Sequence, residues 1–335
     1  MGTDLEQSPA PTIDLVVNTY RGDVPFLEVM MSHITRALAE APLRERILVV
    51  DGSEPVGRFK DSSEARAAMA RLTAIADRLE GSGVIDRVHM LDWSDERVEA
   101  VMRDWYGDPE APVSCRAGTA VYQYCSAVDA SDADYVLHLD SDILLHSPDG
   151  GGWVAEAIAL LKAHEDAIVV QPMGGPPIAM TLAQVIFGPR ARPARPARGA
   201  SPGGSVGSRM FVLDRRRLHS CFLPLQPAKS GDRWEQAMTS TAARRGFRRY
   251  TFWDERTYAS HAFTHGPEFV RLAPDLVWAT EQGIYPFRRS GYRWDVRVEG
   301  WHKWPWVVSI RLGRLARAFG STTLGGKTRF GGVGV

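Results

Sequence analysis

This chain contains few cysteines and no long apolar run. The three cysteines, Cys115, Cys125 and Cys221, are odd in number and lack the spacing of metal ligands. We therefore expect reduced thiols in a cytoplasmic protein rather than disulfides or a zinc site. No apolar stretch approaches the length needed to cross a bilayer. Residues 1–12 are polar and acidic with prolines, which is unlike a secretory signal.

The sequence has no excess of charge of either sign. Its 40 basic and 40 acidic residues give a formal net charge of zero. No global field therefore favours nucleic acid, and the dispersed basic residues argue against such a partner. Only five of the basic residues are lysines. This arginine-rich composition is typical of GC-rich bacterial coding, so a single arginine is weak evidence for an anion site.

Two phosphate-binding motifs are also missing. No Gly-x-Gly-x-x-Gly follows the first expected strand at residues 13–18, which argues against a dinucleotide-binding fold. Residues 320–328 resemble a phosphate loop, but the spacing is one residue too long and no helix follows. We interpret this segment as part of a loose tail.

The apolar residues that are present follow an alternating pattern. With 335 residues, 44% of them hydrophobic, the chain can form one large α/β domain or two small ones. Apolar runs predict strands at 13–18, 46–51, 84–91, 167–171, 208–213 and 247–253. One-sided patterns and helix signals predict helices at 26–38, 65–79, 114–128, 153–164, 214–219 and 231–246. This alternation indicates a mostly parallel sheet flanked by helices.

The most informative stretch is residues 135–145, Tyr-Val-Leu-His-Leu-Asp-Ser-Asp-Ile-Leu-Leu. An apolar run meets Asp140 and Asp142 and then resumes, which predicts a buried strand with two carboxylates at its end. Ligands bind at that end of the strands in an open α/β sheet. Two carboxylates this close repel each other unless a cation lies between them, and a divalent metal ion suits their oxygens. The alternative is a turn with two solvated aspartates.

Two segments depart from the alternation. Residues 189–204 are rich in proline, arginine and glycine, so we expect a flexible loop at 188–207, either a functional lid or a tolerated insertion. Residues 301–319 combine three tryptophans, an apolar face and three arginines at intervals of three. Such a helix is compatible with peripheral contact with an anionic membrane, and packing on its own domain is the alternative.

The order of these features resembles the glycosyltransferases of the GT-A fold, especially those of family 2. The resemblance covers about residues 12–266. It rests on the order and spacing of these motifs: Val17-Asn-Thr-Tyr-Arg21, Val49-Val-Asp-Gly-Ser53, Asp140-Ser-Asp142, Gly207-Ser-Arg-Met-Phe-Val, Asp232 with Glu235, Gly246, and His261 with His265. Two elements depart from the family pattern. Tyr122-Gln-Tyr-Cys125 replaces its Ala-Arg-Asn element, and the looser Asp232-Arg-Trp-Glu235 replaces its Glu-Asp pair.

The resemblance implies binding roles for individual residues. Contacts with the nucleotide sugar are implied for Thr19, Tyr20, Arg21, Asp51, Asp140 and Ser141. Asp140 and Asp142 would bind Mn²⁺ or Mg²⁺. His265, or with less support His261, would complete the metal site from the other side of the cleft.

The resemblance also implies a general base that takes the proton of the acceptor hydroxyl. Glu235 is the first candidate and Asp232 the second. Asp232 could instead cap the helix that follows it, because helix starts favour aspartate.

The implied protein is a metal-dependent glycosyltransferase with a Rossmann-like, mostly parallel sheet, an acceptor-side portion and a helical tail. It would transfer a sugar from a nucleoside-diphosphate sugar, a UDP-sugar in first place, to a hydroxyl of a small-molecule or glycan acceptor. An inverting course is slightly favoured over a retaining one. A nucleotidyltransferase acting on a sugar phosphate, and an inactive carbohydrate-binding protein of the same fold, are the alternatives.

The expected organisation has four parts. Residues 1–11 are a disordered N-terminus, and residues 12–172 are the nucleotide-sugar-binding half of one domain. Residues 173–270 are the acceptor-side and catalytic half. Residues 271–335 are an extension with an amphipathic helix and a loose tail.

Overall fold

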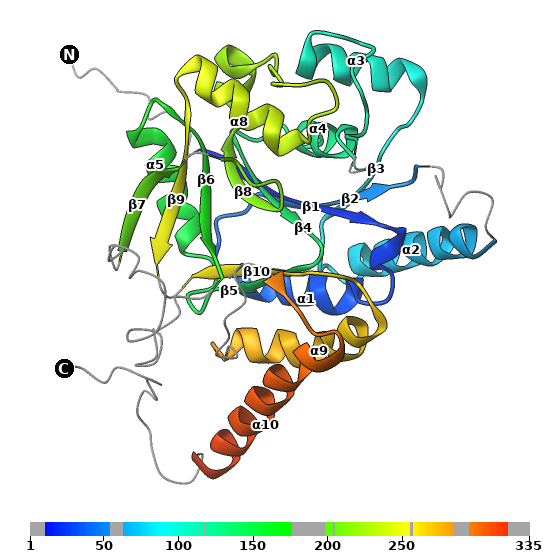
Figure 1. The fold of residues 1–335 in the computed structure, drawn as a ribbon, viewed down its shortest axis with the longest axis vertical. Helices are drawn as coiled ribbons and strands as arrows, with labels where there is room; N and C mark the ends of the chain where they lie inside the picture. Colours follow the sequence, from blue (N-terminus) through cyan, green and yellow to red (C-terminus); the bar gives the residue numbers. More distant parts are fainter. Residues whose placement is uncertain are drawn as a thin grey trace, which may run out of the picture.

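A computed structural model of the protein describes residues 11–53, 63–116, 118, 120–175, 198–203, 205–254, 257–284 and 295–320 (Figure 1). The expected disordered N-terminus up to residue 10, the tail 321–335 and most of the expected loop 188–207 lie outside these residues.

The strands are β1 (Ile13–Tyr20), β2 (Glu45–Asp51), β3 (Arg87–Met90), β4 (Tyr135–Asp140), β5 (Ile143–His146), β6 (Ala167–Gly174), β7 (Arg198–Gly203), β8 (Met210–Asp214), β9 (Arg248–Asp254), β10 (Tyr258–Ala262) and β11 (Asp295–Val296). The helices are η1 (Arg21–Asp23), α1 (Leu27–Ala37), α2 (Ser63–Gly81), α3 (Asp95–Tyr106), α4 (Tyr122–Asp129), α5 (Trp153–Ala163), α7 (Arg215–Arg217), η3 (Leu218–Phe222), α8 (Trp234–Arg245), α9 (Pro267–Glu281), η4 (Gly300–His302) and α10 (Lys303–Gly320).

One sheet runs through the described chain in the order β11-β10-β6-β8-β4-β1-β2-β3, and β5, β7 and β9 pair beside this path. Parallel pairings join β3 to β2, β2 to β1 and β1 to β4. β8 lies antiparallel between β4 and β6, so β4 and β6 run in the same direction. The protein has a mixed α/β fold with a large central sheet flanked by helices, as the alternating pattern predicts.

Helices cover both faces of this sheet. In the view of Figure 1, α3, α4 and α8 lie above the sheet, and α1, α2 and α9 lie below it. Alternate residues of β1 belong to two apolar clusters on opposite faces of the sheet. Leu15 and Val17 are in the cluster with α1, α2 and α5, whereas Val16 is in the cluster with α3, α4 and α8. A strand buried on both faces explains why residues 13–17 read as a nearly continuous apolar run.

Two predicted elements differ from those observed. The helix predicted at 114–128 is confined to α4, and Ser114 instead forms a β-bridge with Ala120. The strand predicted over 135–145 stops after Asp140 and resumes as β5, which pairs antiparallel with β10. A local apolar pattern predicts extended backbone but not the partner strand.

The sequence pattern also misses α3 and α9. α9 begins with Pro267 and contains Pro274, yet it buries Phe269, Leu272 and Leu276. Proline normally ends a helical pattern, so these buried residues do not read as one helix. Tertiary packing decides the helix here.

His33 of α1 connects this helix to β5 and α9. Its Nε2 accepts a hydrogen bond from the Leu145 backbone N–H at 3.0 Å, and its Nδ1 lies 3.0 Å from Glu281 Oε1. An accepting Nε2 leaves the proton of the neutral ring on Nδ1. Burial lowers the pKa of His33, and this effect exceeds the opposing effect of Glu281.

We expect the free energy of unfolding to fall as the pH drops below about 6.5, the ordinary pKa of histidine. Below that pH the unfolded chain binds a proton at His33 that the folded chain resists. His33→Gln can keep both hydrogen bonds without titrating, so it should lose less stability than the wild type between about pH 7 and about pH 5. Urea unfolding at both pH values measures the difference, and equal losses would contradict this role of His33.

Candidate active site

The predicted carboxylates lie at the carboxyl edge of the parallel strands. Asp140 is the last residue of β4, and Asp142 lies in the break before β5. Asn18 of β1 is the register partner of Asp140, so the loop after β1 begins beside the end of β4. The edge predicted to bind ligands therefore carries both aspartates and the η1 loop.

Asp140 is held by Tyr124 and faces Arg209. The Tyr124 hydroxyl, from α4, lies 3.1 Å from Asp140 Oδ2. Arg209 precedes β8 and places Nη1 3.9 Å from the same oxygen. Burial, together with the charge of Asp142, raises the pKa of Asp140 well above its usual range. Two neighbouring buried carboxylates resist ionising together, and here Asp140 is the one that resists.

Asp142 stays charged although its side chain is almost fully buried. Its Oδ2 lies 3.0 Å from His265 Nε2 and 3.3 Å from Arg209 Nη1. Burial acts to raise the pKa of Asp142, but the His265 hydrogen bond and the Arg209 charge outweigh it, so the pKa is lowered. His265 responds in the opposite sense: burial acts to lower its pKa, and Asp142 raises it overall. The predicted ligands Asp142 and His265 are therefore in direct contact.

Asp23 of η1 is a third carboxylate at this point. Its Oδ2 accepts hydrogen bonds from Ser141 Oγ at 2.6 Å, Thr19 Oγ1 at 3.1 Å and Tyr20 N at 3.1 Å. Its Oδ1 lies 3.6 Å from His265 Nδ1. Burial raises the pKa of Asp23 to about 6. Asp23 carries no distinctive motif in the sequence, and its only signal is its place in the loop after the first strand.

Two residues that are predicted to contact the nucleotide sugar, Thr19 and Ser141, instead form hydrogen bonds with the Asp23 carboxylate. Both hydroxyls act as donors in these bonds. Both residues are buried, with 1% of Thr19 and 2% of Ser141 exposed. Tyr20 is different, because its side chain is among the few large apolar ones on the surface. Its ring lies so close to Gly22 that a Cβ there would come within 2.5 Å of Tyr20 Cζ.

Asp51 and Arg21 connect the loops after β1 and β2. Asp51 Oδ1 accepts hydrogen bonds from Ser53 N at 2.8 Å and from Trp93 Nε1 at 3.1 Å. Arg21 donates to the Ser53 carbonyl oxygen. The structure thus brings the two predicted base-contacting loops together.

The two base candidates differ in their surroundings. Glu235 lies in the first turn of α8, and burial followed by the charges of Asp140 and Glu235 raises the pKa of Tyr124. The Glu235 carboxylate lies 3.8 Å from Arg233 Nη1. Asp232 accepts a hydrogen bond from Lys229 N at 2.9 Å. The N-cap of α8 is Arg233, so the capping alternative for Asp232 is wrong.

His261 lies in β10 and is engaged elsewhere. Its Nε2 lies 3.0 Å from Asp295 Oδ1, and its Nδ1 lies 2.6 Å from the Ala262 carbonyl oxygen. Of the two histidines considered as metal ligands, His265 contacts the carboxylates.

The cluster has the donor atoms for a divalent cation. Two buried oxygens, Asp23 Oδ1 and Asp142 Oδ1, have no hydrogen-bond partner in the described part of the chain. Buried, unpartnered carboxylate oxygens are unfavourable unless a cation meets them. The described residues contain no group of three or more His, Cys, Asp or Glu side chains arranged to hold a metal ion. A cation here would take part of its ligands from a bound molecule.

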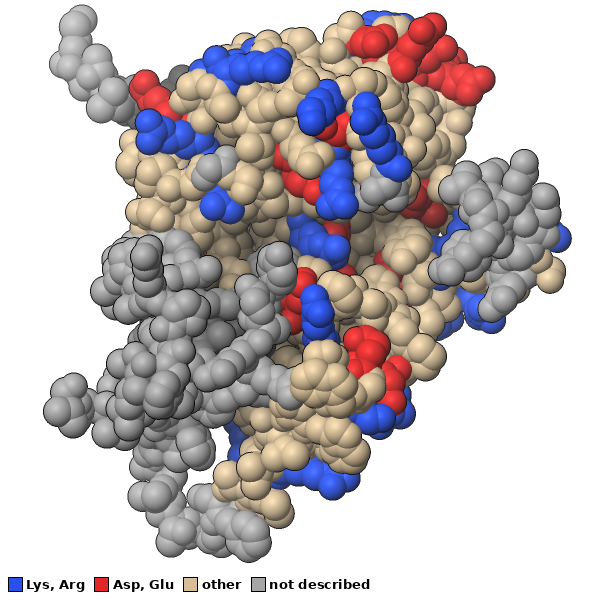
Figure 2. All heavy atoms as spheres, viewed as in Figure 1, with Lys and Arg blue, Asp and Glu red and all other residues tan. Residues whose placement is uncertain are grey.

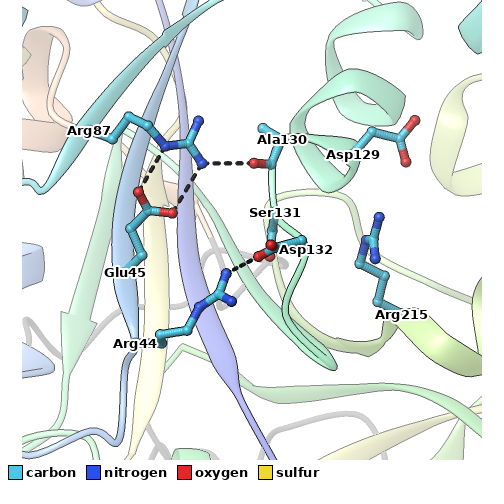
Figure 3. A pocket seen from close by; sticks show the side chains of 8 residues that line it. All are labelled: Arg44, Glu45, Arg87, Asp129, Ala130, Ser131, Asp132 and Arg215. Carbon is cyan, nitrogen blue, oxygen red and sulfur yellow. Dashed lines mark hydrogen bonds and ion pairs between the residues drawn. The ribbon is translucent and has the colours of Figure 1, made fainter.

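A separate cavity of about 610 Å³ opens at the opposite edge of the sheet, where β2 and β3 begin (Figure 3). Arg87 pairs there with Glu45, and Arg44 pairs with Asp14 and Asp132. Because most of its charged side chains neutralise one another, we assign this cavity a structural role at the start of the strands.

No family model matches the chain, and no curated protein matches its sequence. Solved structures similar to it include two GT-A glycosyltransferases. One is glucosyl-3-phosphoglycerate synthase from Mycobacterium tuberculosis, solved in complex with Mn²⁺, uridine diphosphate and glucosyl-3-phosphoglycerate. It is 15% identical to this chain, the match covers 84% of this chain and 86% of that chain, and the TM-score is 0.38. GalNAc-T7 with UDP, GalNAc and Mn²⁺ is 10% identical, with 76% of this chain and 44% of that chain covered and a TM-score of 0.45. A mycobacterial protein is 17% identical, with coverages of 81% and 73% and a TM-score of 0.38. We base the functional proposal on the chain's own residues.

Tyr124 and Tyr106 provide a matched test of the contact with Asp140. The Tyr106 hydroxyl is buried without a hydrogen-bond partner among the described residues. We expect Tyr124→Phe to lower the free energy of unfolding by about 1–2 kcal/mol, because it removes a buried donor from a carboxylate. Tyr106→Phe should leave stability unchanged or raise it slightly. Urea unfolding of the metal-free proteins measures both, and equal effects would show that the Asp140 contact contributes nothing.

Proposed function

We propose that this chain is a metal-dependent glycosyltransferase that transfers a sugar from a nucleoside-diphosphate sugar to a hydroxyl of a small-molecule or glycan acceptor. A UDP-sugar is the first candidate for the donor. The observation that carries the proposal is the convergence of Asp23, Asp140 and Asp142 with His265 and Arg209 at the carboxyl edge of the sheet. A cluster of this charge is suited to a cation and the diphosphate that the cation accompanies.

Asp140, Asp142 and His265 are the residues that would hold Mn²⁺ or Mg²⁺ together with oxygens of a bound diphosphate, because the described residues do not form a complete metal site by themselves. Their oxygen atoms suit either ion, and the imidazole is better tolerated by Mn²⁺. When bound, the cation supplies positive charge where negative charge develops on the leaving diphosphate. Arg209 provides a second positive group, and its side chain is 41% exposed. It can therefore bind a phosphate oxygen while it faces Asp142.

The loops after β1 and β2 would bind the nucleoside. The two hydrogen bonds that the Asp51 carboxylate accepts from described residues both go to Oδ1. Oδ2 can therefore accept from an N–H of a base or an O–H of a ribose. The exposed Tyr20 ring offers a flat face for a base, and Gly22 permits its position against the backbone.

Glu235 is the general base of the proposal. It would accept the proton of the acceptor hydroxyl as that oxygen attacks the sugar carbon, which corresponds to an inverting course. Asp232 is the second candidate, although its carboxylate already accepts from Lys229 N.

Metal-dependent binding of UDP is the first test. A ligand that binds only the folded protein raises its melting temperature, so UDP with Mn²⁺ should raise it further than UDP alone. Asp142→Asn should lose this additional shift while remaining folded, because the amide keeps the size of the side chain and removes its charge. Asp129→Asn, in a partly buried aspartate that accepts a hydrogen bond from Trp105, is the control and should retain the shift. The proposal fails if no nucleotide or nucleotide sugar gives a metal-dependent shift in the wild type.

Kinetics distinguish the two base candidates. Glu235→Gln should lower kcat by roughly 10²- to 10⁴-fold, because a general base contributes about that much. Its affinity for UDP should not change, and Asp232→Asn should lose far less activity. The opposite order would assign the base to Asp232. Small effects in both variants would contradict an inverting base on α8.

A further inference from the structure

The helix α10 has two apolar faces. Trp306 and Ile310 pack in the cluster with α9 and are 4% and 3% exposed. A second set is more than half exposed: Trp301 of η4 with Trp304, Val308, Leu312 and Leu315 of α10. Successive members of this set are three or four residues apart, so they form one stripe along the outer side of the helix. We call this set the outer stripe.

The outer stripe is unusual within this protein. The other large apolar side chains that are exposed in the described chain, Tyr20, Met90 and Phe263, lie singly on separate elements. Single exposed apolar residues are normal, whereas a contiguous exposed set indicates a binding surface. α10 lies at one end of the molecule (Figure 1).

The charged residues of α10 itself have one sign. Residues 300–320 contain Lys303, Arg311, Arg314 and Arg317 but no Asp or Glu, although the whole chain has zero formal net charge. Lys303 and Arg314 pair with acidic residues of α9, Glu268 and Asp275. Arg311 is exposed and, at 3.6 residues per turn, lies at the edge of the outer stripe, whereas Arg317 lies on the opposite side of the helix. Figure 2 shows basic side chains at the lower end of the molecule, where Figure 1 places α10.

We propose that α10 docks this protein peripherally on an anionic lipid surface through the outer stripe. A helix with tryptophan and leucine on one face and arginines beside them lies in the plane of the membrane interface. Tryptophan favours the headgroup level, and the arginines meet lipid phosphates. The described chain contains no helix long and apolar enough to cross a membrane.

The charges favour lipid over a second copy of this chain. Two outer stripes packed face to face would bring Arg311 of both helices close to one interface without an acidic residue of either helix beside it. Like charges at an interface are unfavourable. An anionic lipid surface has the complementary charge, and it covers the same apolar residues.

Vesicle sedimentation with the full chain tests the proposal and needs no enzymatic activity. The wild type should sediment with phosphatidylcholine vesicles that contain phosphatidylglycerol and not with phosphatidylcholine alone. Added salt should reduce the bound fraction. The double variant Leu312→Ser, Leu315→Ser should bind at least about tenfold more weakly, because two apolar side chains no longer enter the lipid. Met90→Ser, an exposed apolar residue on β3, is the matched control and should bind like the wild type.

A second pair of substitutions tests the charge. Arg311→Gln should weaken binding to the anionic vesicles and reduce its dependence on salt, whereas Arg317→Gln, on the opposite side of the helix, is its control and should have a smaller effect. The proposal would be overturned if the wild-type protein did not sediment with anionic vesicles, or if it bound both vesicle types equally. So would a Leu312, Leu315 variant that binds like the wild type. A wild-type dimer that this variant dissociates in sedimentation equilibrium would assign the stripe to a second copy instead.

Discussion

Repulsion among three neighbouring carboxylates, two buried and one partly buried, is the constraint on which the proposed site depends. Asp140 and Asp142 are separated by one residue, and Asp23 is attached to them through Ser141. Burial of like charges is unfavourable, so cations and hydrogen-bond donors must surround them. The pKa shifts record how the protein divides the charge: the pKa of Asp142 is lowered, and those of Asp140 and Asp23 are raised.

The mixed sheet supplies the groups that neutralise this charge. Because β8 is antiparallel to β4, the segment that precedes β8 lies at the carboxyl edge of β4, and this places Arg209 beside the aspartates. β5 turns from the sheet edge to pair with β10, and the chain after β10 carries His265 to Asp142. A uniformly parallel sheet would place the start of β8 at the opposite edge. The antiparallel strand is therefore part of the site.

The C-terminal helix illustrates a different use of apolar residues. One side of α10 stabilises α9, and the other side remains exposed beside arginines. The proposed donor site and the proposed lipid contact occupy different elements, so the chemistry of one can change without the other. An enzyme docked in this way would act on acceptors that are held at a membrane surface.

The sequence by itself determined the alternation of strands and helices, and with it the sheet whose carboxyl edge receives Asp140 and Asp142. The length of an apolar run, its periodicity and the polarity of its end are local signals, and they can be read without knowing which segments pack against it. Only the tertiary structure decided which groups surround those aspartates. Asp23, Tyr124 and Arg209 have no distinctive local pattern, and they reach the site through a short turn, a helix and an antiparallel pairing. Strand order and direction depend on contacts between distant segments, and a single sequence does not display them.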